Sequence, residues 1–180
     1  KNLLALRFTR GEGASTITMQ LSRNLYLGHA DRNAFATITR KIREFLSAVQ
    51  LEQTFTKDEI LEFYLNVVYF GKGSYGIAAA AQVYFGKAPA DLTLGEVATL
   101  IAVLKGPGFY DPTGKHPERG LNRRNAVLSH MLKCGDIIEQ QAEEANAKTI
   151  QAKKEDDIAA GGIANSFVES IRTQLTQKAE

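Results

Sequence analysis

The chain has 180 residues, of which 44% are hydrophobic and 23% charged, and this composition is typical of a globular domain and argues against disorder. The net charge of +2 is too small to indicate nucleic-acid binding by itself. A single cysteine, Cys134, excludes an intrachain disulfide and a CxxC metal site, and three scattered histidines give no metal-ligand spacing. No apolar run reaches the roughly 18 residues that a membrane-spanning helix needs.

Hydrophobic residues recur at helical spacing along most of the chain. Residues 34–54 carry one apolar stripe that predicts a long helix, formed by Phe35, Ile38, Ile42, Phe45, Leu46 and Val49. Thr56 and Glu59 form a capping box, which predicts the start of a second helix. The buried face expected for that helix consists of Ile60, Leu61, Tyr64, Leu65 and Val68.

A second capping box, Thr93 with Glu96, opens a helix over residues 97–105. Residues 106–120 hold three of the four prolines and are expected to form a long loop. A helix over 121–132 should then bury Val127, Leu128, Met131 and Leu132. Residues 137–157 predict an exposed helix, and a last amphipathic stretch follows Gly161 and Gly162. Strand signals are weak, so the expected fold class is mainly α.

The segment Arg40-Lys41-Ile42-Arg43-Glu44 places three cations around one carboxylate. If Ile42 faces the core, Glu44 lies on the opposite face of the helix, about 200° away at ~100° per residue. The cations should keep this carboxylate ionised. Such an array suits a phosphate or pyrophosphate, which the cations bind while the carboxylate orients them. From spacing alone, a solvated face with salt bridges between successive turns is the simpler explanation.

Residues 13–20 bring small and hydroxylated side chains to the start of another helix. Free backbone N–H groups and hydroxyls at such a position form a natural anion site, although an ordinary helix cap gives the same pattern. One side of this helix is expected to carry Gln20, Arg23, Asn24 and Leu27.

Two further patterns have simpler structural explanations. Residues 71–76 match GxGxxG, but no βαβ pattern surrounds them, so we expect a sharp turn between helices and no nucleotide cofactor. Arg123 and Arg124 lie at the start of the helix expected over 121–132, where cations oppose the helix dipole. A salt bridge to an acidic residue is the expected partner, and a ligand phosphate is the alternative.

Taken in order, four segments resemble motifs of the glycosyltransferase domain of class A penicillin-binding proteins and monofunctional peptidoglycan transglycosylases. GASTITMQL at residues 13–21 is similar to the family's second motif, and RKIRE at 40–44 to its third. KDEILEFYLN at 57–66 is similar to the fourth, and RRNAVL at 123–128 to the fifth. The order and number of these matches outweigh the simpler explanations of each segment.

The resemblance implies a lysozyme-like helical fold and the polymerisation of lipid II with inversion and release of polyprenyl pyrophosphate. On this reading Glu44 is the catalytic-site glutamate that organises the cations around the pyrophosphate. The substrate-binding residues that the motifs imply are Ser15, Thr16, Gln20, Arg23, Arg40, Lys41, Lys57 and Asn66, and the loop residue Arg32 as a further donor-site arginine.

The resemblance also implies partners and a location. The partners are lipid II, the growing glycan chain, the outer face of the bacterial cytoplasmic membrane and inhibitors of the moenomycin type, with no nucleic acid. It gives no certain cofactor and no dedicated metal ligands; Mg²⁺ or Mn²⁺ at the pyrophosphate is the one candidate.

Two departures from the family pattern bear on activity. Met19 stands where many relatives carry a second Gln. The family's first motif, a Glu-Asp pair that carries the proposed general base, is absent, so we expect this chain alone to polymerise lipid II poorly, since loss of a general base costs about 10²–10⁴-fold.

Residues 166–172 resemble a linker toward a transpeptidase domain, whereas Ser-x-x-Lys and Lys-Thr-Gly are absent. We therefore expect a glycosyltransferase domain over 1–135 and a helical extension over 136–180, from a bifunctional parent. The alternatives are a lytic transglycosylase or lysozyme-like enzyme that cleaves glycan, and a non-catalytic module that retains only the donor site.

Overall fold

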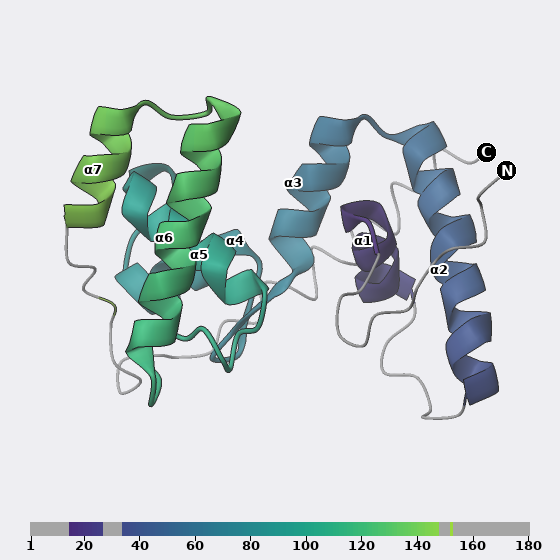
Figure 1. Ribbon diagram of the computed structural model, residues 1–180. Coiled ribbons are helices and arrows are strands. Elements are labelled where there is room, and N and C mark those ends of the chain that lie inside the picture. Colours follow the sequence, from purple (N-terminus) through teal and green to yellow (C-terminus); the bar gives the residue numbers. More distant parts are fainter. Residues whose placement is uncertain (1–14, 27–33, 148–151, 153–180) are drawn as a thin grey trace, which may run out of the picture.

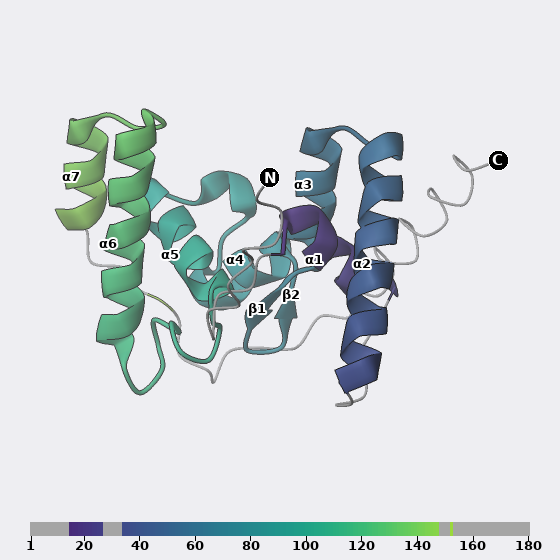
Figure 2. The same ribbon diagram turned by 45° about the vertical axis from the view of Figure 1, so that its right-hand side comes forward.

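The computed structural model describes residues 15–26, 34–147 and 152. Its helices form two groups, with α1, α2 and α3 on one side and α4 to α7 on the other (Figure 1). A short β-hairpin lies at the base of the region between the two groups (Figure 2). The mainly α expectation is confirmed for this part of the chain. The amphipathic stretch expected after Gly161 lies outside the described residues.

The first group consists of α1 (Ile17–Tyr26), α2 (Ala34–Thr54) and α3 (Lys57–Val67). The helix over 34–54 is confirmed in full, and Thr56 and Glu59 cap α3 reciprocally as their spacing predicts. Helix α1 packs against both α2 and α3. The core that joins the three helices contains Leu21, Leu25, Leu51, Phe55, Ile60, Tyr64 and Val67.

The hairpin pairs β1 (Tyr69–Gly71) with β2 (Ser74–Tyr75) in antiparallel register. The GxGxxG residues therefore form a tight turn between α3 and α4, as expected, and Lys72 at its tip has a positive φ of 50°. The Lys72 side chain reaches back to Thr113 Oγ1 and lies 5.3 Å from the centre of the Tyr84 ring. These contacts fasten the hairpin to the loop that follows α5.

The second group consists of α4 (Ile77–Phe85), a 3₁₀ turn (Pro89–Asp91), α5 (Leu94–Leu104), α6 (Pro117–Cys134) and α7 (Glu139–Ala147). Helix α5 is its centre because it contacts α4, α6 and α7. The capping box of Thr93 and Glu96 at its start is confirmed. Two apolar clusters hold this group together, one around Tyr84, Phe70 and Leu100, the other around Ala98, Leu128 and Ile137.

The expected orientation of α2 is wrong. Glu44 is the buried residue, with 1% of its surface exposed, whereas Ile42 is 55% exposed. The apolar stripe on α2 thus faces away from the core. The reason is that α1 packs against the face of α2 that carries Glu44, Ala48 and Leu51, and ion pairs compensate the buried carboxylate.

Smaller corrections concern α3, α6 and α7. Leu61 on α3 and Leu132 on α6 are exposed, not buried. Helix α6 begins at Pro117, since proline is favourable in the first turn of a helix. The long loop expected over 106–120 therefore ends at His116. Helix α7 is not exposed throughout, because it buries alanines against α5 and α6.

Among the described helices none is long and apolar enough to cross a bilayer.

The hairpin generates the first prediction. Gly76 has a φ of 82°, and a Cβ added there would lie 2.4 Å from the Asn66 carbonyl oxygen, so Gly76→Ala should destabilise the fold by more than about 3 kcal/mol through strain and overlap. Gly73→Ala is the matched control: it has a φ of 70° but no atom within 4 Å, and should cost only about 1–2 kcal/mol. Chemical denaturation measures both, and equal losses would contradict the overlap.

Candidate functional site

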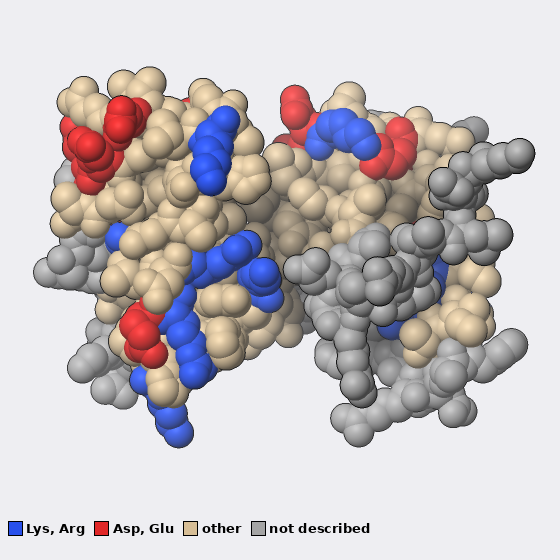
Figure 3. Space-filling model, in the orientation of Figure 1, with Lys and Arg blue, Asp and Glu red and all other residues tan. Residues whose placement is uncertain are grey.

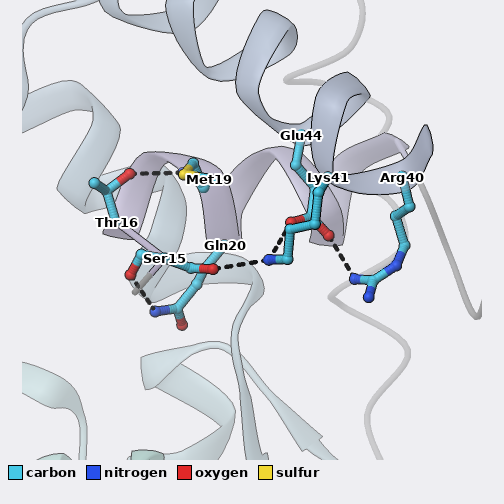
Figure 4. A network of polar contacts seen from close by, with 7 residues as sticks. All are labelled: Ser15, Thr16, Met19, Gln20, Arg40, Lys41 and Glu44. Carbon is cyan, nitrogen blue, oxygen red and sulfur yellow. Dashed lines mark hydrogen bonds and ion pairs between the residues drawn. The ribbon is translucent and has the colours of Figure 1, made fainter. Parts of the chain in front are cut away.

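The site centres on the buried carboxylate of Glu44 (Figure 4). Arg40 Nη1 lies 2.6 Å from Glu44 Oε1, and Lys41 Nζ lies 2.7 Å from Glu44 Oε2. Both cations come from the preceding turn of α2, as their i,i+4 and i,i+3 spacing predicts. Arg43, the third cation of the segment, is exposed and takes no part in this cluster. Each oxygen of Glu44 is therefore bound to one of two cations.

Lys41 connects this cluster to the segment that precedes α1. Its Nζ donates a hydrogen bond of 2.9 Å to Ser15 Oγ. The adjacent hydroxyl, Thr16 Oγ1, accepts from the Met19 backbone N–H at 3.2 Å and so caps the first turn of α1. The two hydroxyls thus have different roles: that of Thr16 stabilises the helix start, and that of Ser15 faces the cations.

Gln20 and Tyr64 extend the network to α3. The Tyr64 hydroxyl donates to Gln20 Oε1 at 3.3 Å, and Gln20 Nε2 donates to the Ser15 carbonyl oxygen at 3.5 Å. Burial raises the pKa of the Tyr64 hydroxyl above its ordinary value, while the charge of nearby Arg23 opposes that rise. Arg23 is thereby placed close to the same network.

A second cluster ties the three helices together and was not expected from the sequence. Thr18 on α1 donates a 2.5 Å hydrogen bond to Glu52 Oε1 on α2, and Lys57 at the start of α3 is ion-paired with Glu52 Oε2. Hydrogen bonds from Lys57 and then from Thr18 lower the pKa of Glu52 below its ordinary value of 4.5. No helical spacing links these residues, because the chain turns between Glu52 and Lys57.

The structure brings together most of the site residues that the sequence analysis named. The residues joined by direct contacts are Ser15, Gln20, Arg40, Lys41 and Glu44, with Thr16 at the adjacent helix start. Lys57 lies elsewhere, with 77% of its side chain exposed beside Glu52. Within the described residues no hydrogen bond joins the Asn66 side chain to the network. Arg32 lies outside the described residues.

The charge balance of the site favours an anion. Arg23, Arg40 and Lys41 contribute three positive charges, and Glu44 neutralises one of them. Arg40 and Lys41 are 23% and 41% exposed, so each can contact a ligand while it remains bound to the carboxylate beneath.

A metal site receives little support from the side chains. Over the described part of the chain, no group of three or more His, Cys, Asp and Glu could hold a metal ion. The carboxylate of Glu44 is already shared between two cations. Mg²⁺ or Mn²⁺ at a pyrophosphate therefore remains a prediction that none of the described side chains is arranged to support.

The fifth-motif arginines differ from the expectation. Arg124 is buried and donates to the Asn146 carbonyl oxygen at 3.3 Å and to Asn125 Oδ1 at 3.0 Å, so it fastens α7 to α6. Because α6 begins at Pro117, both arginines lie in its second turn and not at its start. Arg124 therefore has a structural role that requires no ligand.

Comparison with known families decides the relationship. The family model described as transglycosylase matches residues 2–132. The chain belongs to the transglycosylase family. Its glycosyltransferase motifs on α1 and α2 thus coincide with the cationic site.

Individual relatives agree with this assignment. The chain is 50% identical to penicillin-binding protein 1A of Aquifex aeolicus over 93% of its length, and 46% identical to penicillin-binding protein 1A of Escherichia coli over 78%. It spans only 22% and 16% of those two proteins. The crystal structure of penicillin-binding protein 1A from Haemophilus influenzae matches with a TM-score of 0.53 and 36% identity, over 72% of this chain and 19% of that one. The expected helical transglycosylase fold is thereby confirmed.

The cluster around Glu52 generates a prediction about acid stability. Because the folded-state pKa of Glu52 lies below the unfolded value near 4.5, its contribution to stability is present above that pH and is lost as the pH falls through the folded-state pKa. The free energy of unfolding of Glu52→Gln should therefore decline less steeply below pH 4.5 than that of the unchanged chain. Urea denaturation at a series of pH values measures the slope.

Glu62→Gln is the control for this experiment, because Glu62 is exposed on α3 and forms no ion pair with the described residues. It should retain the slope of the unchanged chain. If Glu52→Gln also retained that slope, the lowered pKa would be contradicted.

Proposed function

We propose that this chain is the part of a peptidoglycan glycosyltransferase that binds the pyrophosphate of a lipid-linked donor, in an enzyme that polymerises lipid II into glycan strands. One observation carries the proposal: a buried carboxylate, Glu44, holds Arg40 and Lys41 side by side where each still reaches solvent. Family membership supports it, because the cluster lies within the residues that match the transglycosylase model.

The reaction determines what this cluster contributes. The acceptor hydroxyl loses its proton to a general base and its oxygen bonds to the anomeric carbon of the donor. The bond from that carbon to the pyrophosphate oxygen breaks, and negative charge develops on the leaving group. Fixed cations at that position lower the barrier because they need no reorganisation during the reaction. Glu44 keeps the cations in place, whereas Ser15 holds Lys41 from the opposite side.

Glu44 is poorly placed to serve as the proton acceptor. Both of its oxygens bind cations, so neither is directed at an acceptor hydroxyl. A glycan-cleaving enzyme would need a carboxyl that donates a proton to the leaving oxygen. The two ion pairs of Glu44 disfavour that role, and the array of cations favours synthesis from a pyrophosphate donor.

Binding of a fluorescent lipid II analogue that carries the pyrophosphate, in mild detergent, tests the proposal. Arg40→Ala removes one charge-assisted contact, which is worth about 1.5–3 kcal/mol, so affinity should fall roughly 10- to 100-fold. Glu44→Gln should weaken binding as well, because the cations lose the group that positions them.

The matched control is Arg43→Ala, which removes the same charge from an exposed position on the same helix. It should leave affinity nearly unchanged, apart from a small long-range effect. Circular dichroism confirms that each variant is folded. Equal affinity for Arg40→Ala and Arg43→Ala, or no saturable binding by the unchanged chain, would refute the donor site.

We further propose that α2 contacts the outer leaflet of the cytoplasmic membrane through its apolar stripe. This stripe is exposed on the side of α2 opposite Glu44 and comprises Ile38, Ile42, Phe45, Leu46 and Val49. A contiguous exposed apolar surface marks an interaction site. A lipid substrate whose pyrophosphate binds Arg40 and Lys41 would leave its polyprenyl chain within the bilayer beside this helix.

Sedimentation with phosphatidylglycerol vesicles tests the membrane contact. Phe45 and Leu46 are 57% and 61% exposed, and changing both to Ser should reduce vesicle binding by about 10-fold or more, because each buried side chain contributes roughly 1.5–3 kcal/mol. Ile138→Ser changes an equally exposed residue just before α7 and should have little effect. Equal losses for the two variants would argue against the stripe.

A further inference from the structure

The loop before α6 and the first two turns of that helix form a cationic surface outside the donor site. This surface, here called the basic face, consists of Lys115, Arg119 and Arg123 with the exposed ring of Phe109. Lys and Arg side chains gather over the lower half of α6 and the loop beneath it (Figure 3). It lies in the second group of helices, apart from Arg40, Lys41 and Glu44.

The basic face is unfavourable for the fold taken alone. Cations in the first turns of a helix oppose its dipole, and arginines four residues apart on one helix repel each other. Glu118, the acid of the first turn, lies 3.1 Å from His116 Nδ1 and is not paired with either arginine. Arg119 and Arg123 have no ion pair with any of the described residues. Their placement is therefore explained by an external anion better than by stability.

Both arginines are available to such an anion. The Arg119 guanidinium lies 4.4 Å from the centre of the Phe109 ring, and this cation–π contact holds it beside a residue that is 54% exposed. Arg123 Nε is buried without a hydrogen-bond partner among the described residues. Turning the Arg123 guanidinium outward to a ligand therefore breaks no hydrogen bond with the residues that the structure describes.

A planar guanidinium binds a carboxylate through two parallel hydrogen bonds, and an exposed aromatic ring can pack against the apolar face of a sugar. A ligand with carboxylates spaced along a carbohydrate chain satisfies both features. The glycan strand made by the proposed reaction has this chemistry, because its sugars carry short peptides that end in carboxylates.

The arrangement of the molecule favours the glycan over lipid headgroups. The apolar stripe proposed to meet the bilayer lies on α2, and α6 is at the opposite end of the molecule in both ribbon views (Figures 1 and 2). The basic face thus lies at the other end of the molecule from the apolar stripe of α2. A polymer that lengthens from the donor site is long enough to reach it.

We propose that the basic face is a second binding surface for the growing glycan strand, which it holds through the carboxylates of the peptides. This inference rests on the proposed function, since the strand is its product. It assigns to Arg119, Arg123 and Phe109 a role in retaining product that is separate from the donor-site chemistry.

Binding of a soluble uncross-linked glycan oligosaccharide with free peptide carboxylates to the 180-residue chain tests the proposal. Changing both Arg119 and Arg123 to Gln should weaken binding about 10-fold or more, as expected for loss of charge-assisted contacts. The control is Lys133→Gln, which removes a cation from the last turn of the same helix and should change affinity less than about twofold. Circular dichroism verifies the fold of each variant.

A second comparison needs no variant. The same oligosaccharide with its carboxylates converted to amides should bind the unchanged chain at least about 10-fold more weakly. Equal affinity for the two oligosaccharides, or no difference between Lys133→Gln and the double variant, would overturn the proposal. So would binding of phosphatidylglycerol vesicles that depends on Arg119 and Arg123, or self-association that depends on them, since these outcomes assign the basic face to a membrane or to a second copy.

The two proposals fail separately. The donor site is refuted if the pyrophosphate lipid shows no saturable binding, or if Arg40→Ala binds it as tightly as the unchanged chain does. Glycan binding can still be measured on its own in that case. If the pyrophosphate lipid binds as expected and the affinity for glycan is the same with and without Arg119 and Arg123, the proposed function stands and the second surface is refuted.

Discussion

The burial of one ionised carboxylate governs the arrangement of the first three helices. Removing a carboxylate from water costs several kcal/mol unless cations and hydrogen bonds replace the lost solvation. Glu44 meets this requirement with Arg40 and Lys41, which lie one turn away on the same helix. Lys41 also donates a hydrogen bond to Ser15, which lies just before α1, so the ion cluster helps to fix how α1 is positioned against α2. The same ion cluster therefore determines both how these helices pack and where the cations lie.

This packing gives α2 two distinct faces. The face that meets α1 is polar at Glu44 and apolar at Ala48 and Leu51, and the opposite face carries the exposed apolar stripe. A single helix thereby carries cations on one side and exposed apolar side chains on the other. The cluster of Thr18, Glu52 and Lys57 fixes the far end of α2 to α1 and α3, so the helix is held at two points along its length.

Local patterns in the sequence predicted much of the fold and of the site. The two capping boxes and the spacing of apolar residues gave the starts of α3 and α5 and the length of α2, because these features depend on interactions within a few residues. The spacing of Arg40, Lys41 and Glu44 gave the ion pairs for the same reason. Which face of α2 is buried could not be derived this way, since hydrophobicity alone selects the stripe. Only the partner helix, with Ser15 and the ion pairs, makes the Glu44 face the buried one.

The contrast between Arg124 and its neighbour Arg123 shows how the structure separates a structural cation from one available to a ligand. Adjacent positions on a helix point about 100° apart, so Arg124 is directed at α7, where the Asn146 carbonyl oxygen accepts a hydrogen bond from it. Asn125 Oδ1, on α6 itself, accepts another. Arg123 points elsewhere and leaves a buried donor without a partner among the described residues. Nothing in the dipeptide itself distinguishes the two roles. The distinction arises because α7 packs against the side of α6 that carries Arg124.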